Sequence, residues 1–169
     1  NAAETTITGK NMVLTAARGS IGTAVNHITT NLLGADKNVD GISAISSGGI
    51  YVDQKGSNGL IVRNVSSGGD IYLGSDQNII MGVVNGTDAV NYIRAENNGD
   101  IVLEARGGSI GEAEYYDEND PTTIKRDTNN GIRILNSAAA SGSANDTNVS
   151  NVVLRAYDSV YVTGIASQD

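Results

Sequence analysis

Cysteine, phenylalanine and tryptophan are absent from this 169-residue sequence, and proline occurs once, as Pro121. Without cysteine the chain forms no disulfide and offers no thiolate ligand to a metal. Without phenylalanine or tryptophan, the core cannot be assembled around the large aromatic side chains that most globular domains use. The core is therefore expected to consist of Ile, Val, Leu and Ala, in thin and repetitive layers. The scarcity of Glu and Lys also argues against long helices.

Basic residues are few as well. Lys and Arg together number 11 against 19 Asp and Glu, which gives a formal net charge of −8. Nucleic acids and anionic membrane surfaces attract basic patches, so neither is an expected partner. Apolar runs stay well short of the roughly 18 residues that a membrane span requires, so no membrane insertion is expected. Because the sequence starts at Asn1 rather than at Met, we expect residues 1–169 to form a single segment excised from a longer repetitive protein.

What the sequence does contain is glycine, with 21 residues, and an internal repeat. The segment 11–22, NMVLTAARGSIG, returns 89 positions later as the segment 100–111, DIVLEARGGSIG. Each copy consists of a short alternating strand, a turn of small residues and one isoleucine between glycines. A sequence that repeats in this way is typical of stacked structural units.

Short apolar segments with β-forming residues recur along the chain, separated by turns of Gly, Asn, Ser and Asp. This pattern predicts an all-β fold. The expected strands are centred on 50–52, 60–62, 71–73, 79–81, 92–93, 101–103, 132–134, 152–154 and 160–162.

A longer period selects among all-β folds. Ile50, Ile71 and Tyr92 follow one another at intervals of 21, and Leu60, Ile80 and Ile101 at intervals of 20 and 21. Two interleaved strand series with one shared period predict a parallel β-helix (β-solenoid) of about 20–21 residues per coil, whereas a sandwich of antiparallel neighbours does not require that period. The positions expected to point inward are Ile50, Val52, Leu60, Val62, Ile71, Leu73, Ile93, Ala95, Ile101, Leu103 and Ile110. The positions expected to point outward are Tyr51, Ile61, Tyr72, Tyr92, Arg94 and Val102.

Three regions interrupt the period and are expected to be polar loop excursions from the coil, at about 23–47, 112–130 and 137–150. The second is the most acidic and is expected to be the more exposed of the first two.

The sequence resembles the passenger repeats of filamentous haemagglutinin-like exoproteins of Gram-negative bacteria, which include large adhesins and leukotoxin-type proteins. The resemblance rests on the Asp-Ile-x-Leu-x-Ala strand with its Gly-Gly-Ser-Ile-Gly turn at 100–111, and on the glycine-led strands at 49–52 and 69–73. It implies a right-handed parallel β-helix that is exported by two-partner secretion through an outer-membrane partner. It further implies a secreted or cell-surface stalk or passenger segment that mediates or supports adhesion, with a leukotoxin segment as the alternative. A host-cell surface protein or glycan is the partner that this role would require.

Tyrosines provide the first candidate binding residues. The spacing of Tyr51, Tyr72 and Tyr92 predicts an outward ladder on one face, with Tyr115 and Tyr116 in the acidic excursion as further candidates. Stacked phenol rings and hydroxyls suit a glycan. The alternative is that similar residues stack simply to stabilise the face.

The acidic excursion provides the second candidate site. Clustered carboxylates can bind Ca²⁺, although the spacing is not that of an EF-hand. A solvated loop that takes part in recognition is the alternative interpretation. The carboxylates are Glu112, Glu114, Asp117, Glu118 and Asp120, of which Glu112, Glu114, Asp117 and Asp120 are the proposed metal ligands.

A carbohydrate-active β-helix enzyme is the remaining alternative, and it would need acids and bases from adjacent coils. Asp70 and Asp100 lead two strands, but their separation in the sequence is greater than one expected coil. Asp53 and Asp76 are expected in turns without basic partners, and His27, the only histidine, has no serine or carboxylate partner at a recognisable spacing. We therefore expect no enzymatic activity and no cofactor.

Overall fold

The computed structural model describes residues 6–34, 36–82, 91–111, 114–117, 120–126, 132–137 and 151–168. Every regular element within these residues is a β-strand, so the expected all-β class is confirmed. Among the same residues, no helix has the length and apolar character needed to cross a membrane.

The first of two large sheets, here called sheet A, has six strands in the order β1-β3-β5-β7-β10-β14. Every neighbouring pair in it is parallel. Its strands are β1 (Thr6–Gly9), β3 (Ile28–Leu32), β5 (Ile50–Gln54), β7 (Ile71–Ser75), β10 (Ile101–Ala105) and β14 (Val152–Ala156).

The second sheet, sheet B, has the order β15-β13-β9-β6-β4-β2, with β8 also paired to β6. All of these pairs are parallel as well. Its strands are β2 (Asn11–Ala16), β4 (Gly41–Ser46), β6 (Leu60–Ser67), β8 (Ile79–Met81), β9 (Tyr92–Ala95), β13 (Ile132–Ser137) and β15 (Val162–Gln168).

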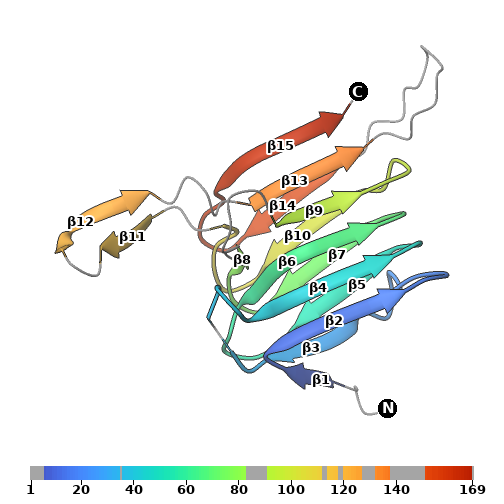
Figure 1. The fold of residues 1–169 in the computed structure, drawn as a ribbon, viewed down its shortest axis with the longest axis horizontal. Coiled ribbons are helices and arrows are strands. Elements are labelled where there is room, and N and C mark those ends of the chain that lie inside the picture. The colour runs from blue at the N-terminus through green and yellow to red at the C-terminus, as the bar shows by residue number, and fades with distance from the viewer. Residues whose placement is uncertain are drawn as a thin grey trace.

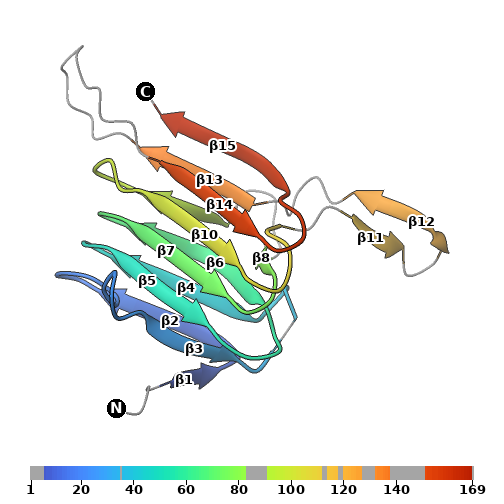
Figure 2. The same ribbon diagram turned by 180° about the vertical axis from the view of Figure 1, so that it is seen from behind.

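The chain alternates between the two sheets except at β8 and β9, which both belong to sheet B, and the sheets lie against each other as two layers (Figure 1). Seen from behind, β5, β7, β10 and β14 of sheet A run side by side (Figure 2). A separate antiparallel hairpin of β11 (Glu114–Asp117) and β12 (Asp120–Arg126) projects from one end of the strands, beyond both layers (Figure 1).

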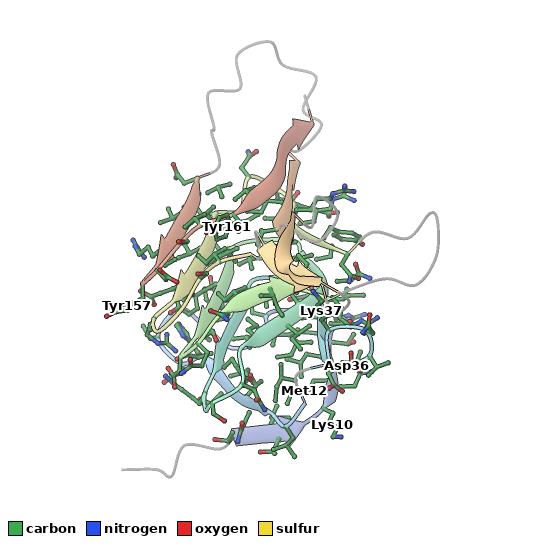
Figure 3. The ribbon with its side chains drawn as sticks, turned by 90° about the vertical axis from the view of Figure 1, so that its left-hand side faces the viewer. Lys10, Met12, Asp36, Lys37, Tyr157 and Tyr161 are labelled. Carbon is green, nitrogen blue, oxygen red and sulfur yellow. The ribbon has the colours of Figure 1, made fainter. Side chains whose placement is uncertain are left out.

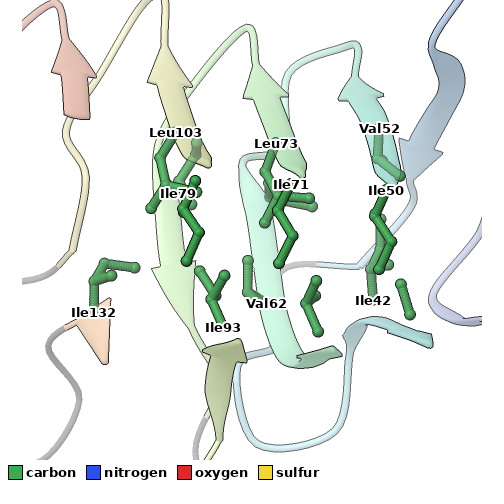
Figure 4. Packing of buried hydrophobic residues seen from close by; sticks show 14 of the residues in the cluster. Ile42, Ile50, Val52, Val62, Ile71, Leu73, Ile79, Ile93, Leu103 and Ile132 are labelled. Atoms are coloured by element: carbon green, nitrogen blue, oxygen red, sulfur yellow. The ribbon is translucent and has the colours of Figure 1, made fainter. Parts of the chain in front are cut away.

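The core fills the space between the two sheets. Ile50, Ile71 and Ile101 pair in register along sheet A, and each is at most 1 % exposed. Side chains from sheet B, such as Val62 and Ile93, meet them from the other side (Figure 4). All eleven positions expected to point inward are buried. The core therefore consists of rows of like aliphatic residues, as the composition predicts.

One orientation predicted from the sequence is wrong. The alternation predicts that Ile61 points to solvent, but it is 2 % exposed. The turn at 36–40 covers this part of sheet B, because Arg63 donates to the Asn38 carbonyl (3.3 Å), and the Lys37 carbonyl lies beside Gly82. Gly41 on the neighbouring strand leaves space for the Ile61 side chain. Figure 3 shows Asp36 and Lys37 on the opposite side of the molecule from Tyr157, which follows β14 of sheet A.

The regular period expected from the sequence is also wrong beyond β7. It holds for Ile50 and Ile71, but the next register partner in sheet A is Ile101 rather than Tyr92. In the second expected series, Leu60 pairs with Ile79 rather than Ile80, and Ile101 lies in the other sheet. The cause is the eight-residue strand β6, which pairs with β8 through its first part and with β9 through its second part. Two short strands in tandem thus occupy one position in sheet B, and β9 is not a neighbour of β7.

The expected excursion at 23–47 also needs correction. It contains β3, which pairs with β1 and β5, and β4, which pairs with β2 and β6. Only the two connecting segments leave the sheets, and they fold back over opposite outer faces. In the second excursion, 114–117 and 120–126 form the β11–β12 hairpin, while most of 137–150 lies outside the described residues.

The two copies of the sequence repeat lie in different sheets. The first copy forms β2 of sheet B, and the second forms β10 of sheet A. Their turn isoleucines have equivalent roles, since Ile21 forms an isolated parallel bridge with Ile50, and Ile110 forms one with Ile79. The repeat therefore encodes a strand and its turn, without specifying the sheet in which they lie.

Candidate functional site

The outer face of sheet A carries most of the polar side chains that the fold brings together. Because neighbouring strands are parallel and in register, outward residues form rows across them. One row contains Tyr51, Tyr72 and Val102, on β5, β7 and β10. The next row contains Asp53, Gly74 and Glu104 on the same strands.

A half-open pocket of about 300 Å³ lies over the first of these rows. We call it the His27 pocket. It is lined by Ala24, His27, Tyr51, Asp70, Ile71, Tyr72, Asp100 and Val102.

His27 forms one wall of this pocket by lying against the two tyrosines. Its ring centroid is 4.3 Å from that of Tyr72 and 6.2 Å from that of Tyr51, and it is nearly parallel to the latter ring, at 20°. The preceding turn is held by reciprocal backbone hydrogen bonds between Thr23 and Asn26, of 2.9 and 3.2 Å. Its ring neighbours are thus tyrosines, which the sequence spacing does not place nearby, because the turn returns His27 to the outer face of sheet A.

Two carboxylates stand at the edge of the pocket. The Asp100 backbone N–H donates to Asp70 Oδ1 (3.0 Å), and Asp100 Oδ1 accepts hydrogen bonds from the backbone N–H and side-chain amide of Asn151. The Tyr51 hydroxyl is 3.4 Å from Asp70 Oδ2. Asp70 and Asp100 precede the paired residues Ile71 and Ile101, so the expectation that their wide spacing in the sequence keeps them apart is wrong. Their separation in the sequence is the actual spacing of β7 and β10.

A network of opposite charges occupies the other end of the same strands. Arg106 pairs with Asp53 and Asp76 and lies 3.6 Å from Glu104, while Lys55 approaches Asp53 (3.0 Å) and Asp76 (3.5 Å). The expectation that Asp53 and Asp76 have no basic partners is therefore wrong. Asp53 also lies within β5 rather than in a turn.

Gly74 makes this network possible. A Cβ atom at this position would lie 2.5 Å from Asp53 Oδ1 and 2.9 Å from both Arg106 Nη1 and the Tyr72 hydroxyl oxygen. Because Gly74 has no side chain, the guanidinium of Arg106 can cross over β7 and reach Asp53.

These contacts shift several pKa values. Burial and the hydrogen bond from its hydroxyl to Glu104 (2.6 Å) raise the pKa of Tyr72 to about 12. Burial and the Asp70 carboxylate raise the pKa of Tyr51. Burial opposes ionisation of Asp76, but Arg106 and Lys55 outweigh it and hold its pKa below the usual value. Burial likewise opposes the charge of Arg106, yet Asp53 and Asp76 raise its pKa. At neutral pH Tyr51 and Tyr72 are therefore neutral donors, and the Asp76–Arg106 pair is ionised.

Comparison with protein-family models, with curated proteins and with solved structures gave no match.

The predicted tyrosine ladder is correct for two of its three members. Tyr51 and Tyr72 are register partners, but Tyr92 lies in β9 of sheet B, beside Asn64. The nearly equal spacing of the three tyrosines is misleading because β8 and β9 share one partner strand, β6. Val102 takes the position in sheet A that the spacing predicts for Tyr92.

The candidates in the acidic excursion lie partly outside the described residues. Tyr115, Tyr116, Glu114 and Asp117 belong to β11 and Asp120 to β12, but their side chains are not described, and Glu112 lies outside the description altogether. In the part of the chain that the structure describes, no group of three or more His, Asp or Glu residues is placed to hold a metal ion. The calcium site stays a prediction.

Sequence reasoning missed the residues that link the strands. Arg106 lies one position beyond the strand of the second repeat copy, and Asp53 lies on an outward position of β5. The available signal was the alternation of outward charges at 53, 55, 76, 104 and 106. These charges indicate a network only when β10 is known to be the neighbour of β7 in sheet A.

Proposed function

We propose that this chain is a segment of a right-handed parallel β-helix that serves as a rigid stalk or passenger segment of a secreted, surface-associated bacterial adhesin or exoprotein. In this proposal the segment mediates or supports adhesion to host cells or surfaces. Export through an outer-membrane partner of a Gram-negative bacterium belongs to the same proposal. The outer face of sheet A carries the recognition surface.

The observation that carries this proposal is the continuous parallel stacking of strands around one aliphatic core. Sheet A runs without a break from β1 to β14, and sheet B from β2 to β15. Rows of buried residues such as Ile50, Ile71 and Ile101 keep the same register along sheet A. Each further strand pair would add backbone hydrogen bonds and core contacts in the same way, so length and stiffness increase together. This is the mechanical property that a stalk requires.

The adhesive role is tested with beads coated with the 169-residue chain and applied to host epithelial cells. We expect saturable attachment that soluble chain competes away. A Tyr51→Ser, Tyr72→Ser double variant should lose attachment, while Tyr92→Ser, which changes sheet B, should retain it. All variants are compared at matched folding, by circular dichroism and thermal unfolding. Wild-type beads that attach no better than beads coated with an unrelated acidic protein would refute the adhesive role of this segment.

A leukotoxin-type segment shares the same fold proposal. Lysis of leukocytes by the soluble chain, measured in parallel with attachment, separates it from an adhesin.

One observation favours a carbohydrate-active enzyme as a second candidate. Asp70 and Asp100 lie on adjacent strands, and Asp53, Asp76 and Glu104 converge on Arg106, so acids from neighbouring strands do meet on one face. Against it, the acids around Arg106 are engaged in ion pairs, and Asp76 has a lowered pKa that does not suit a general acid. Release of reducing ends from a panel of polysaccharides, lost in Asp70→Asn and Asp100→Asn, would establish this candidate instead.

A further inference from the structure

We infer that the His27 pocket binds a primary ammonium group carried on an apolar stem, the chemistry shared by a lysine side chain and a polyamine. The inference rests on the proposed function in that it uses the same outer face, and it specifies which chemical class this face would recognise.

Apart from the imidazole of His27, which offers an N–H donor, the hydrogen-bonding capacity left in the pocket is that of acceptors. The hydroxyl of Tyr72 donates to Glu104 (2.6 Å), and that of Tyr51 lies against Asp70 (3.4 Å), so both phenol protons already have carboxylate partners. The lining carboxylates of Asp70 and Asp100 are acceptors only while ionised. A primary ammonium has three donors and no acceptor, which complements such a site. The hydroxyls of a neutral sugar need donors as well as acceptors.

The charge on the pocket points to the same class of ligand. In the portion of the chain described here, Asp70 and Asp100 form no ion pair, whereas Asp53 and Asp76 on the same face share Arg106 and Lys55. Two neighbouring carboxylates without a counter-charge repel each other, and a cation between them relieves that repulsion. The basic side chains that form ion pairs on this face, Arg106 and Lys55, thus lie at one end, and the acidic end is left to an external cation.

The remaining lining suits the stem of such a ligand. Ala24, Ile71 and Val102 provide apolar surface, and the rings of His27 and Tyr72 lie 4.3 Å apart by their centroids beside it. Aromatic faces attract an ammonium group or the methylenes next to it. A volume of about 300 Å³ is at the lower end of the range for small-molecule sites, as expected for a short alkyl chain.

The test uses the only histidine of the chain as its reporter. The imidazole C–H signals of His27 are followed by proton NMR at constant pH and ionic strength during titration with n-butylammonium chloride. We expect saturable shifts in the millimolar range. n-Butanol, which keeps the stem but lacks the charge, and tetramethylammonium, which keeps the charge but lacks N–H donors, should bind at least about fivefold more weakly. A methyl pyranoside should produce no saturable shift.

Variants distinguish binding in the pocket from nonspecific attraction of a cation to an acidic protein. Asp70→Asn and Asp100→Asn keep the oxygen that accepts the neighbouring N–H, and each should weaken butylammonium binding by about tenfold. Glu96→Gln, which removes the same charge just after β9 in sheet B, should leave binding unchanged. Equal affinity for butanol and butylammonium, tighter binding of the pyranoside, or an equal effect of Glu96→Gln would each overturn the inference.

Nα-acetyl-lysine methylamide and spermidine then distinguish a protein side chain from a polyamine as the source of the ammonium group. Bead attachment without butylammonium binding would count against this inference alone. Butylammonium binding without bead attachment would count against the adhesive role alone.

Discussion

The guanidinium of Arg106, at the end of β10, reaches across β7 and pairs with the carboxylate of Asp53 on β5. The two residues are 53 positions apart in the sequence and two strands apart in sheet A. On the way the same side chain bonds Asp76 (2.9 Å) and approaches the Tyr72 hydroxyl (3.4 Å). One side chain therefore links three consecutive strands and helps to fix their register.

The Gly74→Ala variant should break this link. Its Cβ would lie 2.5 Å from Asp53 Oδ1, too close without movement of the carboxylate or the guanidinium. We expect the free energy of unfolding to fall by about 1–3 kcal/mol, measured by urea denaturation. Gly9→Ala on β1 is the control, because its Cβ would meet nothing closer than Met12 Cγ at 3.8 Å. An equal loss in both variants would mean that Gly74 has no special role.

The Arg106→Met variant should be destabilised by about 1–3 kcal/mol, because it leaves the Asp53 carboxylate, 15 % exposed, without its main partner. Adding Asp53→Asn to this variant should restore part of the loss. Arg94→Met removes the more exposed pair with Glu96 (3.3 Å) and should cost at most about 1 kcal/mol. Thermal and urea unfolding measure these variants and Asp53→Asn alone, and additive effects of the two substitutions at 106 and 53 would contradict the coupling.

Alkaline pH should destabilise the protein through Tyr72. Its pKa is about 12 when folded against 10.0 for the free side chain, so the folded state holds the proton more tightly than the unfolded chain does. This contribution to stability is fully present below pH 10 and is lost as the pH rises from about 10 to about 12. Tyr72→Phe removes the titrating group, so its stability should fall less steeply over this window. Parallel stability curves for the variant and the wild type would contradict the assignment.

The stacked core predicts that substituting two isoleucines by alanine lowers the free energy of unfolding by very different amounts. Ile71 is 1 % exposed between Ile50 and Ile101, and Ile71→Ala should lower the free energy of unfolding by about 2–5 kcal/mol. Ile45 is 57 % exposed on the outer face of sheet B, so Ile45→Ala should lower the free energy of unfolding by no more than about 0.5 kcal/mol. Similar losses at both positions, in urea denaturation, would argue against the described arrangement of the two faces.

Local features of the fold could be predicted from the sequence, because alternation along a strand is a local property. The inward rows through Ile50 and Ile71 followed from it directly. The order of strands beyond β7 could not, since β8 and β9 divide the length of β6 between them. The orientation of Ile61 was mispredicted for a related reason: the turn that buries it lies in an earlier part of the sequence, around Asn38.

Residues of the candidate site could be predicted only where they lie on adjacent strands separated by the expected interval of about 20–21 residues. Tyr51 and Tyr72 met that condition. His27 reaches the pocket through a turn, and Asp100 and Arg106 reach the face through the long interval between β7 and β10. Long-range pairing, which composition and spacing do not encode, therefore decided most of the site.

Partner strands in sheet A keep their alignment although the stretch of chain between them varies widely. The stretch from Ile101 to Val152 is more than twice as long as that from Ile50 to Ile71, yet both pairs are equally well aligned. Alignment is thus set by side chains and backbone within the strands, and the connecting segments are free to lengthen. Over evolutionary time such a chain could accept new surface modules, like the β11–β12 hairpin, at the bends without redesigning its interior. Protein engineers could use the same bends to insert foreign epitopes or binding peptides.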